Sequence, residues 1–240
     1  MRRRGLTYRV CRKAFSLTEI IVVIGIIVVL MALLVPSITG IRKGANRAAD
    51  IANMRSIGRA IDLFQLDYRD EGRIFIAQDT FGERYGLGTL EWWRLLAPYF
   101  YEDLTMTNTR RSIPAYISPG DPSRGGARTV LQHPDDAYRR RSYSFNIKTL
   151  DPYQNRWTWR KTQVLNASAF LLFADHKGPE VGTIWIAPEY DWSMKGIPTN
   201  WFNGDLANFF FLDGHVESIS VKDVMPGGSR HGIFYPQIEE

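Results

Sequence analysis

One carboxylate stands inside the most apolar stretch of the chain. Residues 15–35 read FSLTEIIVVIGIIVVLMALLV, and Glu19 is the only charged residue among them. Placing a carboxylate in a membrane span costs about 2.5–3.5 kcal/mol on insertion scales, so such a residue usually has a function. The alternative is that Glu19 lies near the membrane surface, reaches water and has no role.

The histidines are the other side chains that could bind a metal or transfer a proton. There are four of them, His133, His176, His215 and His231. None belongs to an H-E-x-x-H motif or to a close pair of ligands. Asp175-His176 and Asp213-Gly214-His215 could converge on a divalent cation such as calcium if their strands are neighbours. A histidine beside a hairpin is more often a hydrogen-bonded surface residue, so we expect no catalytic residue, no metal and no cofactor, with calcium as the alternative.

The element that positions Glu19 is predicted to be a helix that spans a membrane. At 1.5 Å per residue, a helix of about 21 residues reaches roughly 30 Å, the thickness of the hydrocarbon core. The residues before it include six basic and no acidic ones, Arg2, Arg3, Arg4, Arg9, Arg12 and Lys13. This flank predicts a cytoplasmic N-terminus and an exported remainder. Without it the chain has 24 basic and 25 acidic residues, so the net charge of +5 does not indicate nucleic-acid binding.

The junction before the span, Lys13-Ala14-Phe15-Ser16-Leu17-Thr18-Glu19-Ile20, resembles the prepilin peptidase site of type IV pilins and type II secretion pseudopilins. The resemblance implies cleavage between Ala14 and Phe15 and methylation of the new Phe15 amine. It also implies that Glu19 pairs with the Phe15 amine of a neighbouring subunit in a filament. Ala14 departs from the family, which usually has glycine there. The implied partners are prepilin peptidase, other pilin or pseudopilin subunits, the inner-membrane assembly platform and membrane lipid, and we do not expect nucleic acid.

Pro36 follows the apolar run, and a proline kinks or ends a helix. The resemblance implies a kink after which the helix resumes, whereas the alternative is that the helix ends there. Apolar residues then recur at spacings of four, three and four on one face of residues 37–70, namely Ile57, Ile61, Phe64 and Tyr68. We assign Asp50 and the arginines to the opposite, polar face. The stripe is broader than strict heptads, so we expect packing on a sheet rather than a coiled coil.

The later chain predicts short elements separated by loops. Residues 89–101 predict a core helix, with a sugar-binding platform of aromatic residues as the alternative. Residues 142–147, 168–174 and 181–187 predict strands. Residues 118–126 predict a surface loop, and Arg139 to Arg141 a solvated one. The strongest hairpin signal joins residues 209–212 to 216–221 at Asp213-Gly214.

Several of these later segments resemble a subfamily of pilin-like proteins that has a C-terminal H-x9-D-G motif. The segment AYISPGDPSRGG, the strand SYSFNI and the run Asp213-Gly214-His215-Val216 carry this resemblance. Asn203 stands where the motif has histidine. A role that needs an imidazole there is therefore in doubt, whereas a structural role for Asn203 remains open.

These patterns predict an α+β, pilin-like fold with one long N-terminal helix packed on an antiparallel sheet. The expected organisation is a leader at 1–14, a membrane half of the helix at 15–36, an amphipathic half at 37–71 and an exported domain at 72–240. Cys11 is the only cysteine and lies in the leader, so the mature protein would have no disulfide. The resemblance implies a single-pass inner-membrane filament subunit, not an enzyme. The alternatives are a membrane-anchored periplasmic binding or hydrolytic domain, and a minor pilin for adhesion or DNA uptake.

Overall fold

The computed structural model describes residues 16–68, 72, 74, 92–105, 113–122, 141–149, 159–177, 185–186, 188, 194, 196–202 and 204–238. The chain divides into two compact units, Met1–Arg42 and Lys43–Glu240. The long helix α1, Leu17–Asp67, contributes residues to both units, and each unit is described by itself.

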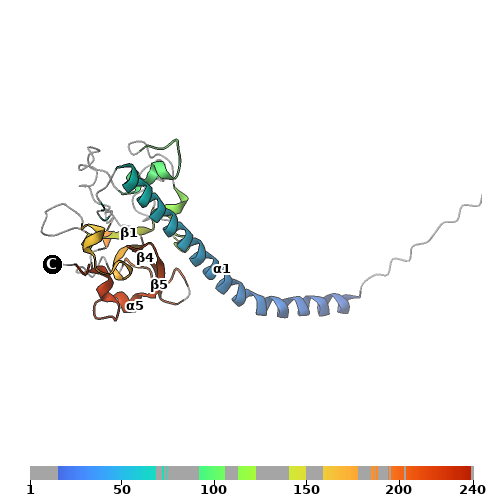
Figure 1. The fold of residues 1–240 in the computed structure, drawn as a ribbon. Coiled ribbons are helices and arrows are strands. Elements are labelled where there is room, and N and C mark those ends of the chain that lie inside the picture. The colour runs from blue at the N-terminus through green and yellow to red at the C-terminus, as the bar shows by residue number, and fades with distance from the viewer. Residues whose placement is uncertain are drawn as a thin grey trace, which may run out of the picture. The chain divides into compact units, whose positions relative to one another are not determined.

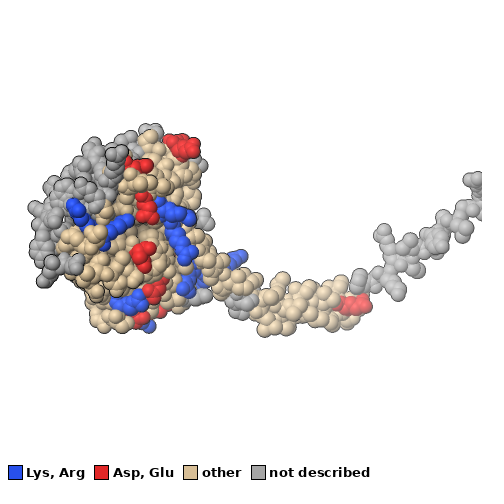
Figure 2. Space-filling view, viewed as in Figure 1, with Lys and Arg blue, Asp and Glu red and all other residues tan. Residues whose placement is uncertain are grey.

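In the first unit, α1 exposes its apolar side chains. The large hydrophobic residues from Leu17 to Leu34 are between 44% and 77% exposed, and α1 is long and apolar enough to cross a membrane. The helix continues through Pro36, so the alternative that it ends there is wrong. Figure 2 shows the surface of this part of α1 as almost wholly uncharged. Such a surface must be covered by lipid or by protein.

In the second unit, α1 packs one face into the core. Ile57, Ile61 and Phe64 are at most 3% exposed, which confirms the face that the apolar spacing predicted. The helix ends at Asp67, earlier than the predicted Asp70. The N–H of Tyr68 still donates to the Phe64 carbonyl at 3.1 Å, so the last turn is complete.

The second unit contains a five-stranded sheet in the order β3-β1-β2-β4-β5. Figure 1 labels its strands β1, β4 and β5. The strands are β1 Tyr143–Asn146, β2 Leu171–Asp175, β3 Trp185–Ile186, β4 Leu206–Phe211 and β5 Val216–Ser220. Neighbours are antiparallel except that β3 is parallel to β1. The α+β class and an antiparallel sheet of four strands, β1, β2, β4 and β5, are confirmed, and β3 differs from the prediction because it pairs in parallel at one edge. The chain reverses direction after β1 and again after β2, so β3 runs in the same direction as β1. Because β3 lies next to β1, these two strands pair in parallel.

Both faces of the sheet are buried, as the side chains of β4 show. Phe210 belongs to the cluster that includes Ile57 and Phe64 of α1. Phe209 and Phe211 belong to a second cluster with residues of the C-terminal α5, Val221–Val224, and η7, His231–Phe234. Side chains alternate between the two faces of a strand. The continuous run Phe209-Phe210-Phe211 is therefore apolar because it serves two cores.

A short helical segment carries the aromatic residues that the sequence placed at 89–101. Within it, α3 covers Trp92–Leu96 and η1 covers Ala97–Tyr99. Trp92 is fully buried and Trp93 is 2% exposed, which confirms the core-helix prediction. Besides η1 and η7, the described 3₁₀ turns are η2 Pro114–Tyr116, η4 Ile147–Thr149, η5 Lys161–Gln163 and η6 Ala167–Ala169.

Candidate functional site

The first turn of α1 places Glu19 at its own helix terminus. Glu19 Oε2 accepts a hydrogen bond from the Ser16 N–H at 2.9 Å, and the Thr18 N–H donates to Ser16 Oγ at 3.2 Å. These contacts satisfy N–H groups that lack intrahelical partners. A carboxylate there is also favoured by the helix dipole. Ala14 and Phe15, the predicted cleavage site, lie outside the described residues.

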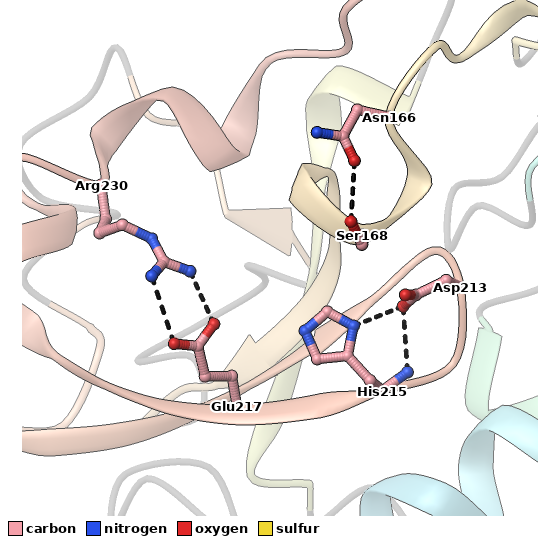
Figure 3. A network of polar contacts seen from close by, with 6 residues as sticks. All are labelled: Asn166, Ser168, Asp213, His215, Glu217 and Arg230. Atoms are coloured by element: carbon pink, nitrogen blue, oxygen red, sulfur yellow. Dashed lines mark hydrogen bonds and ion pairs between the residues drawn. The ribbon is translucent and has the colours of Figure 1, made fainter.

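The predicted Asp213-Gly214 turn joins β4 to β5 and is held by its own side chains (Figure 3). Asp213 Oδ1 accepts the His215 N–H at 3.1 Å and lies 2.5 Å from His215 Nδ1. Gly214 has φ +89°, a conformation that favours glycine. The imidazole stacks on Phe211 at 4.4 Å. The hairpin prediction is confirmed, and His215 is the hydrogen-bonded surface residue expected. Asn203 is outside the described residues.

The two Asp–His pairs lie at opposite ends of the β2–β4 strand pair. The Leu212 N–H donates to the Phe170 carbonyl at 3.0 Å, which places the Asp213 turn next to the start of β2. Asp175 ends β2, four residues after Leu171. The convergence considered as a calcium site therefore does not occur. The described part of the chain contains no group of three His, Cys, Asp or Glu residues that could hold a metal ion.

Two further polar pairs lie on the surface near the hairpin (Figure 3). Arg230 makes a bidentate contact with Glu217, with Nη2–Oε2 at 2.6 Å and Nη1–Oε1 at 3.2 Å. Ser168 Oγ donates to Asn166 Oδ1 at 2.8 Å. The side chains of Arg230 and Glu217 are 41% and 40% exposed. These contacts join surface segments to one another.

The most unusual feature is a buried carboxyl cluster, defined as Asp50, Tyr143, Asp175 and Asn208. Tyr143 Oη donates to Asp50 Oδ1 at 2.7 Å, and Asn208 Nδ2 donates to Asp50 Oδ2 at 2.6 Å. The main-chain N–H of Asn208 donates to Asp175 Oδ2 at 2.7 Å. All four residues are at most 1% exposed. One helix and three strands therefore meet at these four residues.

Polar contacts continue outward from this cluster toward β5 and α1. Ser218 Oγ donates to Asn208 Oδ1, and Arg47 Nε donates to Ser218 Oγ at 2.7 Å. Asn53 Nδ2 donates to the Ile117 carbonyl at 3.1 Å. The second half of α1 is thus attached to the sheet and to the segment after η2 by directed bonds as well as by apolar packing.

Three sequence predictions are corrected around this cluster. Asp50 lies on the apolar face of α1, not on the polar face, because positions 50, 54, 57, 61 and 64 share one side of a helix. Ser118 and Asp121 are 1% and 4% exposed, although their turn chemistry predicted a surface loop. Ser142 Oγ donates to Asp121 Oδ2 at 2.7 Å. Arg141 is 6% exposed rather than solvated.

Burial dominates the electrostatics of the cluster. It raises the pKa of Asp175 well above the ordinary aspartate value, and the negative charge of Asp50 raises it further. The pKa of Tyr143 is also raised, first by burial and then by the charges of Asp50 and Asp175. The Tyr143 hydroxyl therefore remains a hydrogen-bond donor, and a proton on the carboxyl pair is favoured.

A cavity of about 220 Å³ lies between the second half of α1 and the hairpin turn. Its lining combines apolar and polar residues, namely Gly58, Ile61, Asp62, Gln65, Lys161, Leu172, Phe210, Leu212, Asp213 and Gly214. Lys161 Nζ lies 3.8 Å from Asp62 Oδ1. Ligand pockets are commonly about 300–1,000 Å³, so this cavity is small for a ligand site.

Comparisons of the chain with protein-family models, with curated proteins and with solved structures found no match. The geometry and the residue types therefore carry the functional argument.

Proposed function

We propose that the chain is a structural subunit of a type II secretion or type IV pilus-like filament. The observation that supports this most strongly is the structural difference between the two halves of α1. Its N-terminal half exposes apolar side chains, whereas its second half is bonded and packed into an α+β unit. A helix with this division suits a subunit whose first half passes from lipid to a bundle of identical helices.

The proposed mechanism is assembly after export. Prepilin peptidase removes residues 1–14, and the new N-terminus at Phe15 leaves the helix intact. The apolar half then exchanges lipid contacts for contacts with neighbouring helices, where close packing supplies the attraction. Glu19, the one carboxylate of this half, pairs with the Phe15 amine of a neighbour and fixes the stagger. Cleavage would give Phe15 a positively charged amine, next in sequence to the helix turn that Glu19 caps.

N-terminal sequencing of the membrane-extracted protein tests the first step. In cells with prepilin peptidase the chain should begin at methylated Phe15, and in cells without it at Met1. A variant carrying Ala14→Gly restores the residue usual in the family and should be cleaved at least as fast. Retention of the leader in both strains contradicts the proposal.

A matched variant tests the second step. Glu19→Ala should leave cleavage intact but abolish filaments in sheared fractions, because the stagger loses its ion pair. Asp62→Ala, an exposed change on the same helix, is the control and should form filaments. Normal polymer from Glu19→Ala contradicts the assembly mechanism.

The second candidate is a membrane-anchored extracytoplasmic binding domain, and the cavity beside Asp213 favours it. Its lining combines apolar and polar residues, although its volume is low for a ligand pocket. This candidate predicts a monomer that keeps its leader, so the same sequencing experiment separates the two functions.

A further inference from the structure

We propose that the Asp50–Asp175 carboxyl pair holds one proton at neutral pH and thereby keeps the second half of α1 on the sheet, which it releases when that proton is lost. This pH-dependent contact lies wholly within Lys43–Glu240 and does not depend on filament assembly.

The geometry divides the two carboxyls into different roles. Both oxygens of Asp50 accept hydrogen bonds, from Tyr143 and from the Asn208 side chain. Burial raises the pKa of Asp50, and these hydrogen bonds partly offset that rise by favouring the charged form. Asp175 accepts one bond, at Oδ2, from the Asn208 main chain. Its Oδ1 is buried and makes no hydrogen bond within the described residues. Asp175 thus has fewer donors than Asp50, so it is the carboxyl that takes the proton.

Asn208 connects the two carboxyls directly. Its side chain binds Asp50 of α1 and its main-chain N–H binds Asp175 of β2. The side-chain amide is itself fixed by Ser218 of β5. A change of charge at Asp175 therefore acts directly on Asn208, the residue that attaches α1 to the sheet.

Other charged and titratable groups of the described residues lie around the pair. Asp121, from the segment after η2, adds a further negative charge that acts on Asp175. Tyr143 of β1 donates a neutral hydroxyl, and Arg47 of α1 binds Ser218. The buried residues Arg141 and His176 flank β1 and β2. Asp50 and Asp175 receive hydrogen bonds from the neutral groups of Tyr143 and Asn208, and the two carboxyls also hydrogen-bond to each other.

A second buried anion next to Asp50 would cost several kcal/mol of desolvation as well as repulsion. The native pKa of Asp175 lies above that of an unfolded aspartate. Its stabilising contribution is therefore complete below the ordinary aspartate pKa and is lost as the pH rises through the native value. The attachment of α1 is strongest on the acid side and weakens toward alkaline pH.

Infrared difference spectroscopy on the full chain in detergent tests the protonation state. The wild type should show the C=O stretch of a protonated carboxylic acid at neutral pH, and this band should disappear on alkalinisation. Asp175→Asn should lack the band, whereas Asp62→Asn, the exposed control on α1, should keep it. Absence of the band from the wild type overturns the proposal.

Hydrogen exchange, expressed as protection factors, tests the link to α1. Above the midpoint, protection of α1 amides 50–64 should fall about tenfold per pH unit in the wild type. Asp175→Asn should remove this dependence because an amide cannot ionise. If that variant does not fold, Asp50→Asn supplies the second test, since removing the neighbouring charge should move the midpoint to lower pH. Unchanged pH dependence in Asp175→Asn, or an unmoved midpoint in Asp50→Asn, contradicts the proposal.

Discussion

The contact between Gly58 of α1 and Phe210 of β4 offers a sharp test of how the helix packs. A Cβ added at Gly58 would lie 2.3 Å from Phe210 Cζ and 2.7 Å from Cε2. Phe210 is 5% exposed and stacks on Phe173 with ring centroids 4.6 Å apart. The ring cannot retreat without disturbing the core, so Gly58→Ala should destabilise the second unit.

The size of the effect follows from two opposing terms. Replacing glycine by alanine inside a helix gains about 1 kcal/mol, while overpacking a core costs about 1–3 kcal/mol. Gly44→Ala is the matched control, because nothing lies within 4 Å of its added Cβ. The control should raise the Tm by about 2–4 °C. Gly58→Ala should have a free energy of unfolding about 1–3 kcal/mol below that of Gly44→Ala.

Thermal unfolding followed by near-ultraviolet circular dichroism in detergent measures both variants. Adding Phe210→Leu to Gly58→Ala should recover part of the loss, and the double-mutant cycle gives the coupling between the two positions. If Gly58→Ala proves as stable as Gly44→Ala, the helix does not lie on Phe210 and the packing described above is refuted.

Three further substitutions test other contacts by urea unfolding. Asn146→Ala should lower the free energy of unfolding by about 1–3 kcal/mol, because the buried carbonyls of Leu171 and Phe234 each lose the donor Asn146 Nδ2; an unchanged midpoint would contradict these bonds. Tyr143→Phe should cost about 1.5–3 kcal/mol, as expected for a lost hydrogen bond to a charged group, and a loss that vanishes in the Asp50→Asn background would support Asp50 as the acceptor. Arg230→Ala should cost at most about 1 kcal/mol, and less at high salt, since its pair with Glu217 is exposed; a large, salt-independent loss would argue against this assignment.

The sequence predicted the elements whose patterns are local. The spacing of Ile57, Ile61 and Phe64 defined the buried face of α1, and Asp213-Gly214 defined the hairpin. The parallel pairing of β3 with β1 could not be predicted, because it depends on the order of strands and not on the residues of either strand. Turn chemistry identified the bend at Ser118 but could not show that other segments cover it.

The buried carboxyl cluster was not predicted from the sequence. Its members are far apart in the sequence, and the position of Asp50 on the apolar face of the helix was overlooked. Asp50 is 93 residues from Tyr143 and 158 from Asn208 in sequence, so no local pattern brings them together. The burial of Asp50 could have been deduced, since it lies four residues before Met54 on the apolar face. A charged residue in register with an apolar stripe is a sequence signal for a buried polar contact.

The division of the chain at Arg42 and Lys43 has a practical outcome for purification. The apolar cores of the second unit are built from Met54 onward, and Arg47 of α1 donates a hydrogen bond to Ser218 of β5. A shortened polypeptide that starts at Lys43 lacks the exposed apolar half of α1 and should therefore stay dissolved in plain aqueous buffer. Such a polypeptide would allow spectroscopy without detergent on the whole second unit, leaving out only the apolar first half of α1.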